Sequence, residues 1–355
     1  MPELSHIAAL VKKAAHKAGF ELAGIAPVGG FAELRRFEAW IAAGRAGEMK
    51  YMEARDEAGK LKRASLQSTA PWARSVIVCA INYNTSQPYS VAVDTPGRGW
   101  ISRYAWSRED YHQVVMRKLR EVESQVRRAA GDDRDLITRC FVDTGPLVER
   151  VYAKHAGVGW IGKNTCILNQ KMGSWLFLGV ILTSLELTPD VPVPDRCGKC
   201  TRCIDACPTD ALVAPYELDS KLCISYLTIE KRSAIPENLR EGMGRHVFGC
   251  DICQDVCPWN RKAPATEAPE FQPREGLVNP ALDWLAGMTA DEFREKFRGS
   301  PIRRTKHSGL RRNAVIAMGN SGQRRFVPQL EKLASDEDPV VAESARWALS
   351  KLLSS

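Results

Sequence analysis

The chain has 355 residues, a formal net charge of +8, 44% hydrophobic and 26% charged residues. This composition is typical of a globular protein and excludes a disordered or collagen-like chain, and the length predicts two or three domains. The longest apolar run, Trp175–Leu182, is too short to span a membrane. The N-terminal residues have an amphipathic helical pattern rather than that of a signal peptide. We therefore expect a cytoplasmic protein without membrane contact, in which disulfide bonds are rare.

The first 190 residues alternate helical and strand patterns. Apolar residues recur at helical spacing in residues 3–19, 31–44, 108–131 and 145–157. Apolar runs predict strands at residues 20–28, 75–83, 136–143 and 174–185. The alternation predicts an α/β or α+β domain, which the proline-rich stretch TPDVPVPDRCG connects to the next segment.

The stretch CGKCTRCIDACPTDAL begins that segment and concentrates four cysteines. A disulfide framework disagrees with the expected compartment, and a zinc site usually has two cysteine pairs held farther apart. The spacing C-x2-C-x2-C-x3-C-P is instead that of bacterial ferredoxins, in which the fourth cysteine binds a second cluster. The four residues are Cys197, Cys200, Cys203 and Cys207.

A second cysteine run is therefore expected, and CDICQDVCPWN supplies it. It contains Cys250, Cys253 and Cys257, but Val247 occupies the position of its first cysteine. Cys223, between the two runs, is the best candidate for the eighth ligand of two [4Fe–4S] clusters. The predicted sets are Cys197, Cys200, Cys203 and Cys257 for cluster one, and Cys207, Cys223, Cys250 and Cys253 for cluster two. Cys79, Cys140 and Cys166 are expected to be structural.

The C-terminal part begins with a second proline-rich connector, residues 261–276, and contains a short repeat. Residues 310–320 and 341–351 align at an offset of 31, which pairs Ala314 with Ala345 and Ala317 with Ala348. Small residues at matched helical positions predict stacked helix pairs of the HEAT kind.

Basic residues gather around the first repeat. Between Pro301 and Arg325 there are seven Lys or Arg residues and no acidic residue. A single charged helix is more often an ordinary solvated face, but this local excess favours contact with a phosphate backbone. The basic residues are Arg303, Arg304, Lys306, Arg311, Arg312, Arg324 and Arg325.

Four motifs together resemble the epoxyqueuosine reductase family: FVDTGPLVERVYAKHAGVGWIGKNTCIL, the first cysteine run, CISYLTIE and FGCDICQDVCPWNR. The resemblance covers nearly the whole chain. It implies a cobalamin-dependent enzyme that reduces the epoxide of the modified wobble base in tRNA to give queuosine. It also implies a nitroreductase-like cobalamin domain over residues 1–190, a ferredoxin-like module over 191–262, and a linker with HEAT-like repeats that contact tRNA over 263–355.

The resemblance also implies roles for individual residues. Asp143 matches the family's general acid, which apolar neighbours such as Trp160 would keep protonated; the pattern alone favours a helix N-cap. Lys163 and Asn164 match the loop beside the corrin, where Gly157, Gly159 and Gly162 would let the backbone approach the ligand. The other residues expected near cobalamin are Arg63, Ser102, Arg103, Ile167, Ser174 and Leu178, with Ser102 standing where some relatives have cysteine.

The implied reaction requires an external low-potential electron donor, such as flavodoxin or ferredoxin, and we expect a monomer that binds the anticodon stem-loop. The sequence is compatible with two mechanisms. Reduced cobalt could attack the epoxide carbon, or it could transfer electrons to it without forming a bond. Two other classes compete: a corrinoid reductive dehalogenase, whose respiratory members carry a twin-arginine signal that is not seen here, and a non-enzymatic electron-transfer adaptor, which leaves the first 190 residues unexplained.

Overall fold

The computed structural model describes residues 2–131 and 134–354, which divide into two compact units. The first unit comprises residues 1–84, 111–201 and 258–266, and the second comprises residues 85–110, 202–257 and 267–355. The chain therefore passes between the units several times. The structural boundaries differ from the consecutive segments predicted from the sequence, because residues 85–110 share a core with the C-terminal helices.

A four-stranded antiparallel sheet with strand order β1-β2-β7-β4 is the centre of the first unit. Its strands match the four apolar runs predicted from the sequence. They are β1 (Leu22–Pro27), β2 (Ser75–Asn82), β4 (Thr138–Phe141) and β7 (Leu176–Thr183). Every residue of β2 is buried, because helices cover both faces of the sheet.

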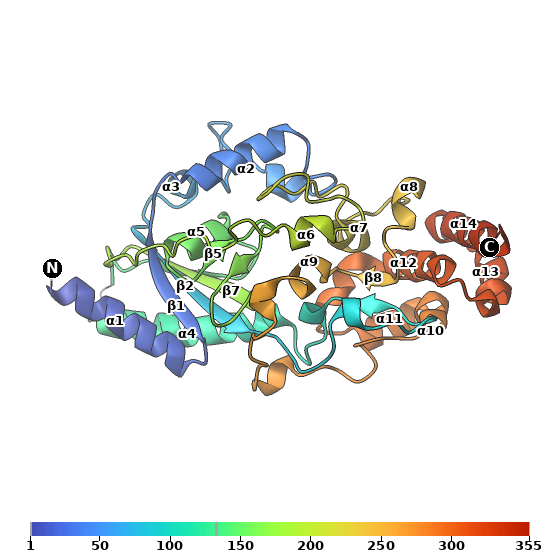
Figure 1. Cartoon of the computed structure of the whole chain (residues 1–355). Helices are drawn as coiled ribbons and strands as arrows, with labels where there is room; N and C mark the ends of the chain where they lie inside the picture. Colours follow the sequence, from blue (N-terminus) through green and yellow to red (C-terminus); the bar gives the residue numbers. More distant parts are fainter. Residues whose placement is uncertain (1, 132–133, 355) are drawn as a thin grey trace. The chain divides into compact units, whose positions relative to one another are not determined.

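Helix α5 (Glu149–His155) packs on one face of this sheet, and α4 (Tyr111–Ala129) packs on the other beside α1 (Pro2–Lys17). Figure 1 shows this arrangement, with α5 and the α1–α4 pair on opposite sides of the strands. Alternation along the strands supplies both cores, because successive side chains point to opposite faces. Val76, Val78 and Ala80 of β2 belong to the core on the α5 side.

The remaining elements of the first unit are short. A two-stranded antiparallel ribbon follows α5 and is formed by β5 (Trp160–Ile161) and β6 (Ile167–Leu168). The others are α2 (Ala32–Ala42), η1 (Lys50–Glu53), α3 (Leu66–Thr69) and η4 (Pro258–Asn260).

The second unit is mostly helical, with one short parallel strand pair formed by β3 (Trp100–Ile101) and β8 (His246–Phe248). Its cysteine-rich part contains α6 (Arg202–Asp205), α7 (Ile224–Ile229), α8 (Glu237–Arg240) and α9 (Ile252–Asp255). The C-terminal helices are α10 (Leu282–Gly287), α11 (Ala290–Lys296), α12 (Lys306–Asn320), α13 (Val327–Leu333) and α14 (Pro339–Ser354). The 3-10 turns are η2 (Ser90–Ala92), η3 (Arg103–Ala105), η5 (Pro269–Phe271), η6 (Pro301–Thr305) and η7 (Arg324–Phe326).

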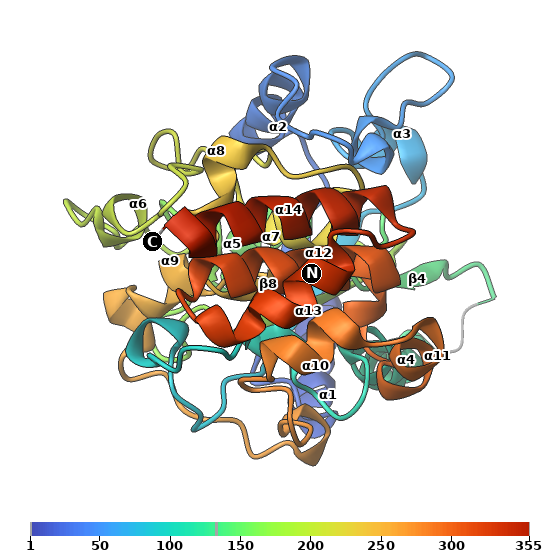
Figure 2. The ribbon, with the colours of Figure 1, turned by 90° about the vertical axis from the view of Figure 1, so that its right-hand side faces the viewer.

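Helices α12 and α14, which carry the sequence repeat, pack directly against each other. Figure 2 shows them side by side, with α13 and α10 beside them. Ala314, Ala317, Ala345 and Ala348 are all buried, as the repeat predicts for small residues at a helix contact. Gly319 makes the approach especially close, because a Cβ atom there would lie 2.9 Å from the Cα of Ala348.

Candidate functional site

The loop between β4 and α5 presents Asp143 with its side chain 48% exposed. Its backbone is in the left-handed region, with φ of 59°. Asp and Asn tolerate that conformation better than most residues other than glycine. The loop is also tight at Gly145, where a Cβ atom would lie 2.5 Å from Leu147 Cδ2. The sequence DTGPL therefore forms a compact turn that displays a carboxylate.

Two side chains at the start of α4 contact the Asp143 carboxylate. The hydroxyl of Tyr111 donates a hydrogen bond to Asp143 Oδ2, and His112 Nε2 lies 3.6 Å from the same oxygen. The Tyr111 ring is held in turn by stacking on Phe177 of β7, with 4.2 Å between ring centroids. A rigid element of the fold therefore orients the carboxylate.

Glu149, the first residue of α5, contacts Asp143 from the other side. The backbone N–H of Asp143 donates to Glu149 Oε1 over 2.8 Å. The pKa of Glu149 is raised well above the usual carboxylic range, first because the protein shields it from water and second because Asp143 repels its negative charge. Nearby Arg63 acts in the opposite direction without cancelling this.

Two expectations about Asp143 are corrected by this geometry. It is not the N-cap of α5, because the helix begins six residues later with Val148 as its N-cap. Its surroundings are not an apolar pocket formed by Trp160, since the carboxylate is half exposed and contacts polar groups. Trp160 is itself buried and packs edge-on against Trp259.

The sequence reasoning missed Tyr111, His112 and Glu149. Glu149 was visible only as an acidic residue in the motif DTGPLVE, and nothing in the local pattern distinguished it from an ordinary first-turn helix acid. Tyr111 and His112 start a helix far from Asp143 in the sequence. Only the tertiary fold brings them together.

The residues of the first unit that were expected near a corrin have different environments. Arg63 donates to the Leu147 carbonyl over 3.2 Å and so contacts the Asp143 loop. Lys163 Nζ donates to the carbonyls of Gly198 and Cys200, over 2.7 and 3.0 Å. These contacts connect Lys163 to the first cysteine run.

The other expected corrin contacts in this unit are Asn164, Ile167, Ser174 and Leu178. Asn164 and Ser174 are buried and are hydrogen-bonded within the protein, to the N–H of Cys166 and to Asn260 respectively. Ile167 is buried in the ribbon, and Leu178 is partly buried on the α5 side of the sheet. Leu178 is therefore the most accessible of the four.

Ser102 and Arg103 belong to the second unit and are both buried. Ser102 donates to Asp251 Oδ1 over 2.5 Å. The Arg103 guanidinium donates to Thr85 and to the carbonyls of Gln87 and Pro88. These contacts give both side chains a structural role and enclose the Arg103 guanidinium in protein. That the two residues lie near cobalamin stays a prediction.

The three glycines expected to admit a planar ligand approach the protein itself. A Cβ atom at Gly157 would lie 2.8 Å from the Val191 carbonyl, and one at Gly159 would lie 2.2 Å from that of Leu168. At Gly162 the nearest atom is Leu168 Cδ1, at 2.4 Å. Internal packing therefore already requires glycine at these positions, and their role in admitting a corrin stays a prediction.

The cysteines assigned to cluster two all lie in the second unit. The thiols of Cys207 and Cys223 are close enough to Cys250 to raise its pKa, in addition to the larger effect of burial. Cys207 Sγ also accepts the N–H of Ala211 over 3.3 Å. Within the described residues no three His, Cys, Asp or Glu side chains converge on a single ion. A cubane separates its thiolates more widely, because each binds a different iron.

The cysteines assigned to cluster one come from both units. Cys197 and Cys200 end the second segment of the first unit, and Cys203 and Cys257 belong to the second unit.

The three remaining cysteines lie elsewhere. Cys79 is fully buried in β2, where burial raises the pKa of its thiol to about 12. Cys140, in β4, also has a raised pKa because of burial and Glu123, and Cys166 adjoins β6.

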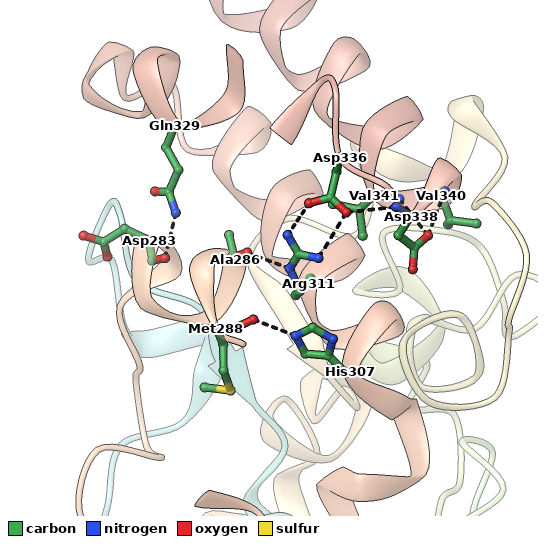
Figure 3. A network of polar contacts seen from close by, with 10 residues as sticks. All are labelled: Asp283, Ala286, Met288, His307, Arg311, Gln329, Asp336, Asp338, Val340 and Val341. Atoms are coloured by element: carbon green, nitrogen blue, oxygen red, sulfur yellow. Dashed lines mark hydrogen bonds and ion pairs between the residues drawn. The ribbon is translucent and has the colours of Figure 1, made fainter. Parts of the chain in front are cut away.

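The basic residues near α12 do not form one exposed patch. Arg312 is 0% exposed, and its guanidinium donates to the carbonyls of Leu227, Lys231 and Ser233. Arg311 donates to the Ala286 carbonyl and is paired with Asp336, as Figure 3 shows. The prediction that Arg312 contacts phosphate is wrong, because protein encloses its guanidinium. Arg311 is only partly buried, but Asp336 already neutralises its charge.

The other five residues are more accessible. Arg303, Arg304, Lys306, Arg324 and Arg325 are exposed. Arg304 nevertheless pairs with Glu230, with 2.5 Å between Nε and Oε1. The expectation that these cations lack acidic neighbours is therefore also wrong for Arg304.

The fold and these sites define a mixed α/β protein with a carboxylate site and a cysteine-rich segment of the ferredoxin kind. Among the described helices, none is both long and apolar enough to cross a membrane. Residues 196–260 match the 4Fe-4S double cluster binding domain, and residues 63–144 match the family described as epoxyqueuosine reductase QueG, DUF1730.

Similarity to curated and solved proteins extends over nearly the whole chain. The epoxyqueuosine reductase of Xanthomonas campestris is 37% identical over 354 residues, covering 99% of this chain and 97% of that protein. The Synechocystis enzyme of the same name is 43% identical, covering 82% and 98%. A crystal structure of epoxyqueuosine reductase with an epoxyqueuosine-modified tRNA-Tyr stem loop aligns with a TM-score of 0.86 at 31% identity, covering 98% of this chain and 91% of that one. The chain belongs to the epoxyqueuosine reductase family.

Proposed function

We propose that this chain reduces epoxyqueuosine to queuosine at the wobble position of tRNA, the last step of queuosine synthesis. The observation that carries the proposal is the half-exposed Asp143 carboxyl, oriented by Tyr111 and Glu149, in a member of this family. Converting an epoxide to an alkene and water consumes two electrons and two protons. The protons must reach one oxygen atom, and Asp143 is the acid that delivers them.

Cobalamin is the cofactor that the family resemblance implies, and the first unit has a surface that suits it. Partly buried apolar side chains adjoin the core on the α5 side of the sheet, and Asp143 follows one of them in sequence. These side chains are Phe141, Ile161, Leu176 and Leu178. They would contact the corrin, with Arg63 and Lys163 as polar neighbours, and the bound cofactor would supply electrons to the epoxide carbon. The family resemblance also implies a nitroreductase-like fold for this unit, and we propose that assignment.

Two [4Fe–4S] clusters would supply those electrons from an external donor such as flavodoxin or ferredoxin. The proximity of Cys207 and Cys223 to Cys250 supports the set proposed for cluster two, which Cys253 completes. Lys163 supports the set proposed for cluster one, because its ammonium group fixes the loop of Cys197 and Cys200 through two carbonyls. Hydrogen bonds and charge around cysteine ligands also influence cluster potential.

The C-terminal helices are proposed to form HEAT-like repeats that contact the anticodon stem-loop of tRNA in a monomeric enzyme. The solved relative bound to a tRNA stem loop supports this partner. The accessible cations suited to phosphate are Arg303, Lys306, Arg324 and Arg325. Arg304 is a weaker candidate because Glu230 already neutralises it.

The experiment is a reaction with defined components under exclusion of oxygen. Purified protein with reconstituted clusters is mixed with cobalamin, a low-potential reductant and an anticodon stem-loop that contains epoxyqueuosine. Mass spectrometry of the nucleosides should show loss of one oxygen atom, and omission of cobalamin should abolish it. If the stem-loop stays unchanged with every component present and the clusters intact, the proposed activity is wrong.

A further inference from the structure

Asp143 is an exposed carboxylic acid that must be protonated when it acts. A solvated Asp is ionised at neutral pH, so half exposure alone does not suit a general acid. The reaction also consumes two protons on one oxygen atom, whereas a single carboxyl group holds one. Asp143 therefore requires a neighbour that can supply a proton, a role that rests on the proposed function.

Glu149 satisfies the geometric requirement for such a neighbour. Its Oε1 accepts the backbone N–H of Asp143 over 2.8 Å, and its carboxyl group lies close enough to that of Asp143 for the Asp143 charge to raise its pKa. A hydrogen bond between two carboxyl groups needs a proton on one of them, since two carboxylates offer only acceptors. The pair can therefore pass a proton only while one of the two carboxyl groups is protonated.

The surrounding charges place that proton on Glu149. Arg63 lowers the pKa of Glu149, but shielding from water together with the Asp143 charge outweighs it, so the pKa of Glu149 is raised. Asp143 is more exposed and is contacted by the Tyr111 hydroxyl and by His112. Because the Tyr111 hydroxyl donates to Asp143, that carboxyl group acts as the acceptor, and the proton is left on the shielded partner.

We propose that Glu149 is a positioning residue that holds the Asp143 loop and supplies Asp143 with the proton that it delivers. As the first C–O bond of the epoxide opens, the proton moves from Glu149 to Asp143 and from Asp143 to the oxygen. Solvent then reprotonates the pair. A second proton follows the same route to the hydroxyl group, which leaves as water while the double bond forms. The two electrons come from the reductant of the proposed function.

Two substitutions separate the two roles. Glu149→Gln keeps an oxygen that can accept the Asp143 N–H but stores no proton, whereas Glu149→Ala removes both. For Glu149→Gln we expect kcat to fall about tenfold or more, with an unchanged KM for the stem-loop. The alkaline fall of kcat should move to lower pH, because the group with the raised pKa is gone. Glu149→Ala should in addition raise KM. Wild-type turnover and an unshifted pH profile in Glu149→Gln would overturn the proposal.

A second measurement does not depend on turnover. Infrared difference spectroscopy of the whole protein should show a protonated carboxyl band at neutral pH that Glu149→Gln lacks. In Asp143→Asn the same band should titrate at lower pH, because the repelling charge is removed. If Glu149→Gln does not fold, the titration of this band in Asp143→Asn still tests whether Glu149 stores a proton. Absence of the band, or an unshifted titration in Asp143→Asn, would overturn the proton store. Undiminished turnover in Asp143→Asn would instead contradict the role of Asp143, and absence of turnover in the wild-type protein would contradict the proposed function.

Discussion

At the residue scale, the left-handed backbone of Asp143 makes one substitution especially informative. Asn adopts positive φ as readily as Asp and has the same shape, but it delivers no proton. We expect Asp143→Asn to keep its iron content and thermal stability while turnover falls about a hundredfold or more. Stopped-flow or discontinuous assays of stem-loop reduction would measure this. Turnover near that of the wild type would show that Asp143 has no catalytic role.

Cys223 carries the other prediction at this scale, because it lies outside both cysteine runs. Removing one of four thiolates should degrade one cluster and leave the other. We expect Cys223→Ala to lose up to half of its iron and sulfide, and to change the electron paramagnetic resonance signal of one cluster. Cys166→Ala is the matched control and should retain both clusters. Full iron and activity in Cys223→Ala would show that another cysteine is the eighth ligand.

The cysteine spacing could be recognised from the sequence because ligand spacing is local. Asp143 could be proposed from the sequence because the family motif around it is also local. The partners of Asp143 could not, since they come from α4 and from a helix start whose acid looks ordinary. Arg312 was misread for the same reason. Nothing in the run LRRN separates the partly buried Arg311 from the fully buried Arg312, and only packing distinguishes them.

At the element scale, α12 braces the segments that carry two of the proposed cluster ligands. Arg312 donates to carbonyls in and after α7, and Asn313 Nδ2 donates to those of Thr228 and Val247, each over 2.9 Å. Helix α7 directly follows Cys223, and β8 shortly precedes Cys250. Helix α12, in the predicted repeat segment, therefore contacts the segment that was predicted as the ferredoxin-like module.

Substitution of Arg312 should consequently affect the clusters as well as stability. Arg312→Ala leaves several buried carbonyls without donors, which we expect to lower the free energy of unfolding by about 2–4 kcal/mol. The iron of the proposed cluster two should become more easily lost on exposure to air. Arg346→Ala is the matched control, because Arg346 is an exposed arginine with one carbonyl contact. Thermal melts and iron release that are equal for the two variants would contradict this bracing role.

The long strands and helices of the first unit could be predicted because their apolar periodicity extends over many residues. The two-residue strands β3, β5 and β6 could not, since such short segments have no periodicity. The repeat in α12 and α14 was visible because close helix packing requires small residues at fixed spacing, and the structure places those residues at the contact.

At the scale of the whole molecule, the interleaved units explain why domain boundaries could not be located from linkers. Trp100 and Trp106 share a core with Phe248 and with the C-terminal helices, so three distant segments fold together. Proline-rich stretches mark exposed turns, but they do not show which core each flanking segment joins.

The chain has a net charge of +8, but only its accessible Lys and Arg side chains can contact tRNA phosphates. We expect simultaneous Arg303→Gln, Lys306→Gln and Arg324→Gln changes to weaken stem-loop binding several-fold and to flatten its salt dependence, because fewer counterions are released. Lys332→Gln is a single-site control on an exposed cation of α13. Binding titrations at low and moderate salt would measure both. An unchanged slope for the triple variant would remove these residues from the interface.

The central claim is that this chain removes the epoxide oxygen from epoxyqueuosine in tRNA through Asp143. The most direct measurement is the nucleoside content of tRNA from a queuosine-synthesising bacterium that lacks its own epoxyqueuosine reductase and expresses this chain or its Asp143→Asn variant. Mass spectrometry should detect queuosine with the wild-type chain and mainly epoxyqueuosine with the variant. Persistence of epoxyqueuosine in cells with well-expressed, cluster-loaded wild-type protein would contradict the activity, and full conversion by the variant would contradict the role of Asp143.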